Sequence, residues 1–257
     1  PYQWRTTGNA IIGAANFLAI PAAFSCGSWL IEHFSHHWLG IAASFFNLLA
    51  LLCILAIKVT DESKGEVQGF WKIWRIGDFF IKSPIPYAAF GIGVLNGGIH
   101  MYIPLYAQNP SQATIFFSIF SITIVISRPI IGGLVDRFKI YFQTLYVTII
   151  AQIIGLLLLV WWGYHPTMLV LILSSILLGV GTANANGVIF TLTMFSAGEK
   201  NLGKADSSQY FAHDAGYATS SVFALSGFPT MWGLLIPTLL ISALLIGWGQ
   251  KRAVPTQ

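Results

Sequence analysis

The ionisable side chains that lie deep in apolar sequence are the first candidates for chemistry. Asp214 stands about ten residues beyond Lys204, roughly 15 Å along a helix, and His213 adjoins it on a different helical face. Arg128 lies about 12 Å of helix before Asp136, so it could meet Asp214 at a similar depth. An ionisable group inside a membrane predicts function. Two interpretations stay open: Asp214 is a proton-coupling carboxylate, or it is a permanent partner of Arg128 or of helix N–H and hydroxyl groups.

A second group of polar residues could bind a metal ion. His33, His36 and His37 lie beside Glu32, and spacings of three and four residues suit metal ligands. The alternative is an exposed turn at the membrane interface, which we prefer because Glu32 is the one carboxylate nearby. We therefore predict no metal site and no cofactor.

The motifs of common enzymes are missing from the sequence. It has no G-x-S-x-G, no H-E-x-x-H and no G-x-x-x-x-G-K-[ST] segment. We predict that the protein is not an enzyme and that ATP hydrolysis is not its energy source. Cys26 and Cys53 fall in apolar runs, where cysteines usually serve as small packing residues.

The composition indicates what must position these residues. Of 257 residues, 55% are apolar and 9% are charged, against about 25% charged in soluble domains. Apolar runs of about 20 residues match the thickness of a bilayer, and they lack the alternation of a β-barrel. We predict an all-α membrane protein with eight spans: Gly8 to Ile31, Trp38 to Ile57, Pro84 to Tyr106, Ser111 to Leu134, Tyr141 to Trp162, Thr167 to Phe195, Ser207 to Phe228 and Met231 to Trp248.

The basic residues predict the orientation of these spans. With eight spans, all 13 Lys and Arg residues fall on one side of the membrane. The positive-inside rule then places both termini in the cytoplasm of a cell membrane protein. The net charge of +4 reflects this topology, so we expect a lipid bilayer as partner and no nucleic acid.

One long connection divides the chain. Residues 58–83 combine a charged start with the aromatic and basic stretch FWKIWRIGDFFIK. This pattern favours an amphipathic helix on the cytoplasmic membrane surface, or else a packed linker between bundles. Either way, residues 1–57 form two spans before the connection and residues 84–257 form six spans after it.

The segment between the fourth and fifth spans carries a family resemblance. Residues 127–139 read SRPIIGGLVDRFK, which resembles the G-x-L-x-D-R-x-G loop signature of the major facilitator superfamily, with Lys139 in place of the last glycine. Residues 113–117 and 211–216 look like segments of its bacterial efflux members. Residues 16–21 are similar to its helix 5, although Ala and Phe replace the expected glycines.

The resemblance implies a twelve-helix transporter of which the eight spans are helices 5 to 12, so we expect four helices to be missing before Pro1. It also implies a gating loop formed by Gly132, Gly133, Asp136 and Arg137. The glycines would allow close approach of helices. Asp136 would accept hydrogen bonds from the start of the first span near Thr6, Thr7 and Gly8. The alternative is that Asp136 and Arg137 solvate a tight turn.

The central cavity of the family is lined by the third and sixth spans of this chain. Asn96 and His100 share one helix face, and with Asn186 they are our candidates to contact substrate. The alternative is that these polar groups bond neighbouring helices. Small residues at 93 and 97, at 179, 183 and 187, and at 212, 216 and 220 predict close-packing faces.

These observations predict a secondary transporter that exports a small organic solute, with protons as the coupling ion, by rocking two bundles about a site at the membrane midplane. Uptake of a sugar or another metabolite is the second hypothesis. The competing class is a truncated remnant or a membrane interaction protein, which the upstream DNA would distinguish. We expect residues 1–257 by themselves not to transport.

Overall fold

The computed structural model describes residues 33–56, 80–107, 109–198, 201–223, 226–227 and 229–253, with a few residues between 23 and 30. Most of the first predicted span and residues 57–79 of the central connection lie outside the described residues. Within them the structure is helical and contains no strand. The helices are α2 (His36–Ala56), a short 3-10 helix η4 (Pro86–Ala88), α3 (Ala89–Tyr106), α4 (Pro110–Phe138), α5 (Tyr141–Tyr164), α6 (Met168–Ala197), α7 (Leu202–Phe223) and α8 (Thr230–Ala253).

Five of the described helices are long and apolar enough to cross a bilayer: η4 with α3, then α4, α5, α6 and α8. Five of the eight predicted spans are thus supported. The apolar stretch of α2, His37–Cys53, is shorter. Helix α7 falls short because charged residues and many Ser, Gln, His and Tyr residues occur along its sequence.

Helix α4 begins and ends with clear local signals. The Asn109 side chain accepts a hydrogen bond from the backbone of Gln112 (3.0 Å) and Pro110 follows it, a favourable start for a helix. The helix ends at Phe138, where Lys139 adopts the left-handed conformation and donates its N–H to Val135. The predicted end at Leu134 was therefore too early.

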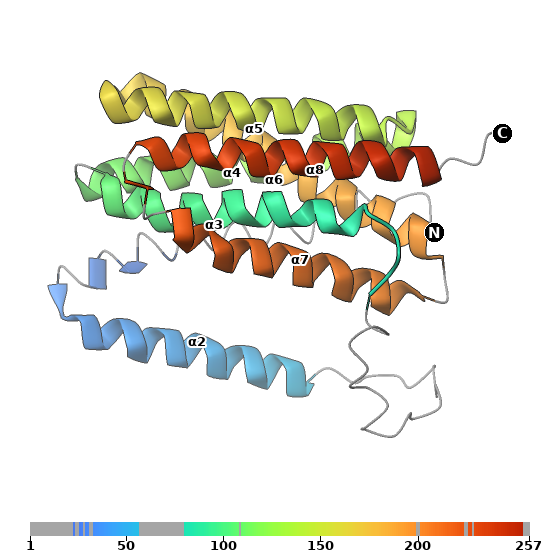
Figure 1. Ribbon diagram of the computed structural model, residues 1–257. Coiled ribbons are helices and arrows are strands. Elements are labelled where there is room, and N and C mark those ends of the chain that lie inside the picture. The colour runs from blue at the N-terminus through green and yellow to red at the C-terminus, as the bar shows by residue number, and fades with distance from the viewer. Residues whose placement is uncertain are drawn as a thin grey trace.

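Helices α3 to α8 form one bundle, with α3 packed between α7 and α8, α5 packed against α6 and α8, and α6 against α4. Figure 1 shows α2 running apart from this bundle. Large side chains of α2, such as Phe46 and Leu55, are exposed, and none of the other described helices packs extensively against it.

Glycines bring α3 and α7 into backbone contact. A Cβ atom on Gly93 would collide with the backbone oxygen of His213, and one on Gly216 would collide with that of Phe90. Near the other end, the Tyr102 hydroxyl donates to the backbone oxygen of Ser220. Helix α7 therefore lies along the length of α3, and the predicted close-packing faces are confirmed at these glycines.

The end of the central connection is attached to α7. The backbone N–H of Ile81 donates to the Ser208 hydroxyl at 3.0 Å, and the Phe80 ring lies edge-on against Phe211 with centroids 5.1 Å apart. The chain thus contacts α7 before it enters α3.

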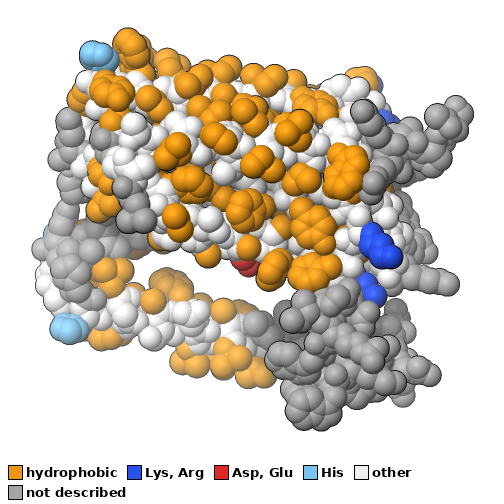
Figure 2. Space-filling model, viewed as in Figure 1, with side chains coloured by type: hydrophobic (Ala, Val, Ile, Leu, Met, Phe, Trp, Pro, Cys, Tyr) orange, Lys and Arg blue, Asp and Glu red, His pale blue; other side chains and the backbone are white. Residues whose placement is uncertain are grey.

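The surface of the bundle is apolar along its length and charged at one end. Figure 2 shows hydrophobic side chains covering the length of the helices, with Lys and Arg at the end where α3 begins and α8 finishes. The described basic residues in connections and helix termini are Lys82, Arg137, Lys139, Lys204, Lys251 and Arg252. Because successive helices run in opposite directions, these positions share one end of the bundle.

Candidate functional site

A polar cluster joins α3 and α7 between the ends of the bundle. The Nδ1 atom of His213 lies 3.2 Å from the Oδ1 atom of Asp214, the next residue on α7, within hydrogen-bond distance. The other ring nitrogen of His213, Nε2, lies 3.2 Å from the side-chain nitrogen of Asn96 on α3. Sequence reasoning placed His213 on a face away from Asp214 and missed both contacts. Adjacent residues point in different directions from a helix, but these two side chains bend toward each other and make contact.

His100 adds a second imidazole to this cluster. Its Nδ1 atom lies 2.8 Å from the backbone oxygen of Asn96, one turn earlier on α3. Its ring stacks on Phe117 of α4 (centroids 5.6 Å apart) and lies 6.0 Å from the ring of Tyr217 on α7. Sequence analysis did not select Tyr217, although its position four residues beyond His213 places it on the same face.

The cluster extends from the core of the bundle to its surface. Asn96 is 5% exposed, while the side chains of His213 and Asp214 are 24% and 77% exposed. The exposed face of α7 that contains Asp214 also carries Ser207, Tyr210, Tyr217 and Ser221. Such a face is expensive to place against lipid, so water or protein is its expected neighbour.

Arg128 does not pair with Asp214. Its side chain is buried in α4, and on α7 it interacts electrostatically with Tyr210, one turn before Asp214. The Asp214 carboxylate pairs with His213 instead. The alternative in which Arg128 is the partner of Asp214 is therefore not supported, because depth along two helices does not determine which faces meet.

Asn186 lies in a different contact from Asn96 and His100. Its backbone oxygen accepts a hydrogen bond from the side chain of Gln209 at 3.3 Å, which joins α6 to α7. The Oδ1 atom of Asn186 is buried and has no hydrogen-bond partner in the described part of the chain. Asn186 thus contacts α7 at Gln209, one turn before His213, whereas Asn96 contacts His213 itself.

The residues of the predicted gating loop lie in the last two turns of α4 rather than in a loop. Asp136 is buried, whereas Arg137 is exposed with its guanidinium 5.4 Å from the Phe138 ring centroid. Gly132 is buried, but a Cβ atom on Gly133 would meet nothing within 4 Å, so close packing does not require glycine there. The expected partners of Asp136, residues 6–8, lie outside the described residues.

No group of three or more His, Cys, Asp or Glu side chains that could hold a metal ion occurs among the described residues. His33 is described and lies against Trp29, with ring centroids 5.0 Å apart. Glu32 of the predicted histidine cluster lies outside the described residues. Cys26 and Cys53 are free thiols.

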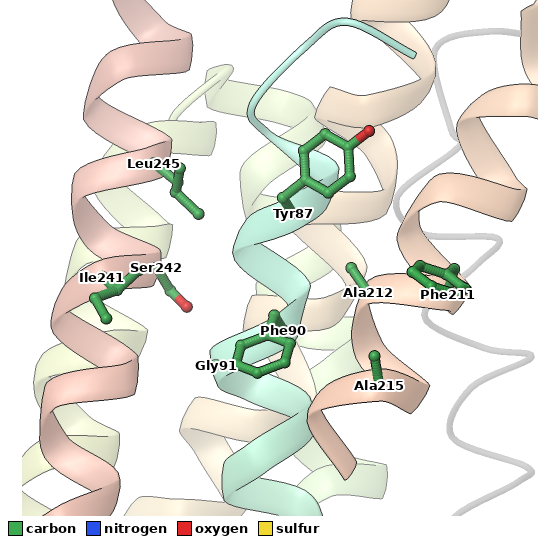
Figure 3. Close-up of a pocket in the computed structure, with 9 residues that line it drawn as sticks. All are labelled: Tyr87, Phe90, Gly91, Phe211, Ala212, Ala215, Ile241, Ser242 and Leu245. Carbon is green, nitrogen blue, oxygen red and sulfur yellow. The ribbon is translucent and has the colours of Figure 1, made fainter. Parts of the chain in front are cut away.

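A cavity of about 380 Å³ lies between α3, α7 and α8. Figure 3 shows its walls, which come from all three helices: Tyr87, Phe90, Gly91, Phe211, Ala212, Ala215, Ile241, Ser242 and Leu245. Because this lining is almost wholly apolar, it offers few groups that could orient a polar solute. The polar cluster is therefore the better candidate site.

The sequence matches the family model of the Major Facilitator Superfamily over residues 3–221. No curated protein matches the chain. The family match confirms the resemblance seen in residues 127–139, and it covers α2 to α6 and nearly all of the polar α7 helix. With helices of spanning length and a match over most of its sequence, the chain belongs to the Major Facilitator Superfamily, whose members transport small molecules across membranes.

Proposed function

We propose that the protein is a proton-coupled secondary transporter that exports a small organic solute by alternating access. Helices α3 to α8 form one bundle of the transporter, residues 1–57 belong to the other bundle, and residues 58–83 connect them in the cytoplasm. The basic residues at one end of the bundle support a cell membrane protein with both termini cytoplasmic.

The observation that carries this proposal is the His213–Asp214 pair on the exposed polar face of α7. With a neutral imidazole and an ionised carboxylate, the pair has a charge of −1. One added proton makes the pair neutral overall. Because a net charge is costly to remove from water, protonation favours states in which this face is covered, and deprotonation favours states in which it is open.

A gating role for Asp136 and Arg137 is the second part of the proposal. Asp136 is a buried acidic residue beside the end of α4, while Arg137 reaches the surface. A carboxylate near the N-terminus of a neighbouring helix stabilises that contact by about 0.3–2 kcal/mol. Such a contact between bundles is strong enough to bias two states and weak enough to break in each transport cycle.

The test is Asp214→Asn in the complete gene product, reconstituted in liposomes. Ethidium export and glucose uptake serve as probes of the two directions of transport. We expect the flux driven by a pH gradient to be at least tenfold lower in the variant, since its amide cannot exchange a proton at physiological pH. Asp206→Asn, on the same helix outside the cluster, is the matched control and keeps the flux. Undiminished pH-driven flux in Asp214→Asn would refute the coupling role.

A further inference from the structure

The hydrogen bonds around His213 determine which ring nitrogen carries its proton. The side-chain nitrogen of Asn96 can only donate, so Nε2 of His213 must accept from it. The proton of the neutral ring is then on Nδ1, where it is donated to the carboxylate of Asp214 at 3.2 Å. Asn96 and Asp214 together thus favour one tautomer of His213.

A second proton on this ring conflicts with the observed orientation of Asn96. Protonated Nε2 becomes a donor and would face the donor NH2 group of the amide. Rotation of the amide by 180° removes the conflict, because it brings Oδ1 of Asn96 to Nε2. That oxygen is buried and has no hydrogen-bond partner in the described part of the chain, so the rotation breaks no other hydrogen bond of Oδ1.

The backbone around this contact is held in place. The backbone oxygen of Asn96 is bonded to His100 Nδ1, and Gly93 holds α3 against the backbone of His213. The ionisable groups facing His213 are Asp214 and Tyr217 on its own helix and His100 on α3, which interacts electrostatically with it. Helix α6, which also packs against α7, contains no ionisable side chain.

We infer that Asn96 is a positioning residue that holds neutral His213 as the Nδ1–H tautomer and reverses its amide when His213 takes up a proton. The unpaired edge of the amide then changes from an acceptor to a pair of donors. A polar group of the solute at this edge is bound in one protonation state and released in the other. The link to transport rests on the proposed function, whereas the tautomer follows from the geometry alone.

The direct test is long-range ¹H–¹⁵N NMR of the complete gene product labelled with ¹⁵N-histidine in lipid nanodiscs. Protonated and unprotonated ring nitrogens are well separated in such spectra, and the signals that disappear in His213→Gln are those of His213. At about pH 8.5, where an ordinary imidazole is neutral, we expect Nδ1 to carry the proton and Nε2 to be unprotonated. A proton on Nε2 at this pH would overturn the inference.

The variant Asn96→Asp tests the role of the amide. A carboxylate on each side of the ring favours protonation of both nitrogens, so the doubly protonated ring persists to a pH higher by about one unit or more. Asn184→Asp is the control, because the Asn184 amide bonds Val180 of its own helix, and it leaves the His213 signals unchanged. Equal effects of the two variants would count against the inference. Loss of coupling in Asp214→Asn is a separate result, which tests the proposed function and not the tautomer.

Discussion

At the scale of single residues, backbone conformation explains one departure from the family signature. Lys139 stands where the signature has glycine, and it is the one described residue other than glycine with a positive φ, 57°. Its N–H completes the last turn of α4 through Val135. A side chain in this conformation costs about 1–2 kcal/mol, which glycine avoids.

Lys139→Gly should therefore stabilise the protein by about 1 kcal/mol, after allowance for the greater freedom of glycine in the unfolded chain. Thermal unfolding in detergent measures the change as a higher Tm. Lys139→Ala is the control, because alanine retains the Cβ atom and gains nothing. Equal Tm values for the two variants would show that the conformation of residue 139 carries no strain.

At the scale of helices, α7 is held by its contacts with α3 rather than by its own hydrophobicity. Its buried residues are small or polar: Ala205, Ser208, Gln209, Ala212, Gly216 and Ser220. Its exposed face carries hydroxyl groups and the Asp214 carboxylate. Small residues allow close backbone approach, which is how membrane helices gain packing energy without a hydrophobic driving force between them.

Gly216→Ala and Gly187→Ala form a matched pair that tests this contact. A Cβ at Gly216 collides with the backbone of Phe90 and Val94, whereas one at Gly187 meets nothing within 4 Å. We expect Gly216→Ala to destabilise by about 1–3 kcal/mol through overpacking. Gly187→Ala is neutral or stabilising by up to about 1 kcal/mol. Thermal unfolding compares them, and equal stability would contradict the close contact.

At the scale of the whole molecule, the charge distribution and the direction of the helices agree on one topology. The described basic residues outside the helix interiors share one end of the bundle, and His165, between α5 and α6, lies at the other. Helix α7 lies along the length of α3, which is long and apolar enough to cross a bilayer, even though α7 is the more polar. We therefore predict that α7 crosses the bilayer.

Single cysteines test this topology after Cys26 and Cys53 are replaced by serine. A membrane-impermeant maleimide added outside intact cells should label Ser226→Cys, beyond α7, and His165→Cys. It should label Lys204→Cys, in the first turn of α7, only after the cells are opened, as the positive-inside rule requires. Labelling of positions 204 and 226 from the same side would show that α7 does not cross the membrane.

The sequence by itself determined the helical class, the approximate limits of α3 to α8 and the family. Apolar runs of membrane length are a strong signal because lipid leaves few alternatives for the backbone. The end of α4 was misplaced by four residues, because Gly132 and Gly133 resembled a loop and Lys139 gave no sign of a left-handed cap.

Tertiary structure alone decided which polar groups meet. Sequence periodicity shows the depth of a residue and the face of its own helix, but the partner depends on how two helices are rotated against each other. The glycines of α3 and α7 set that rotation and bring Asn96 to His213, while Asp214 pairs with His213. The candidate site therefore became visible only when those two helices were placed in contact.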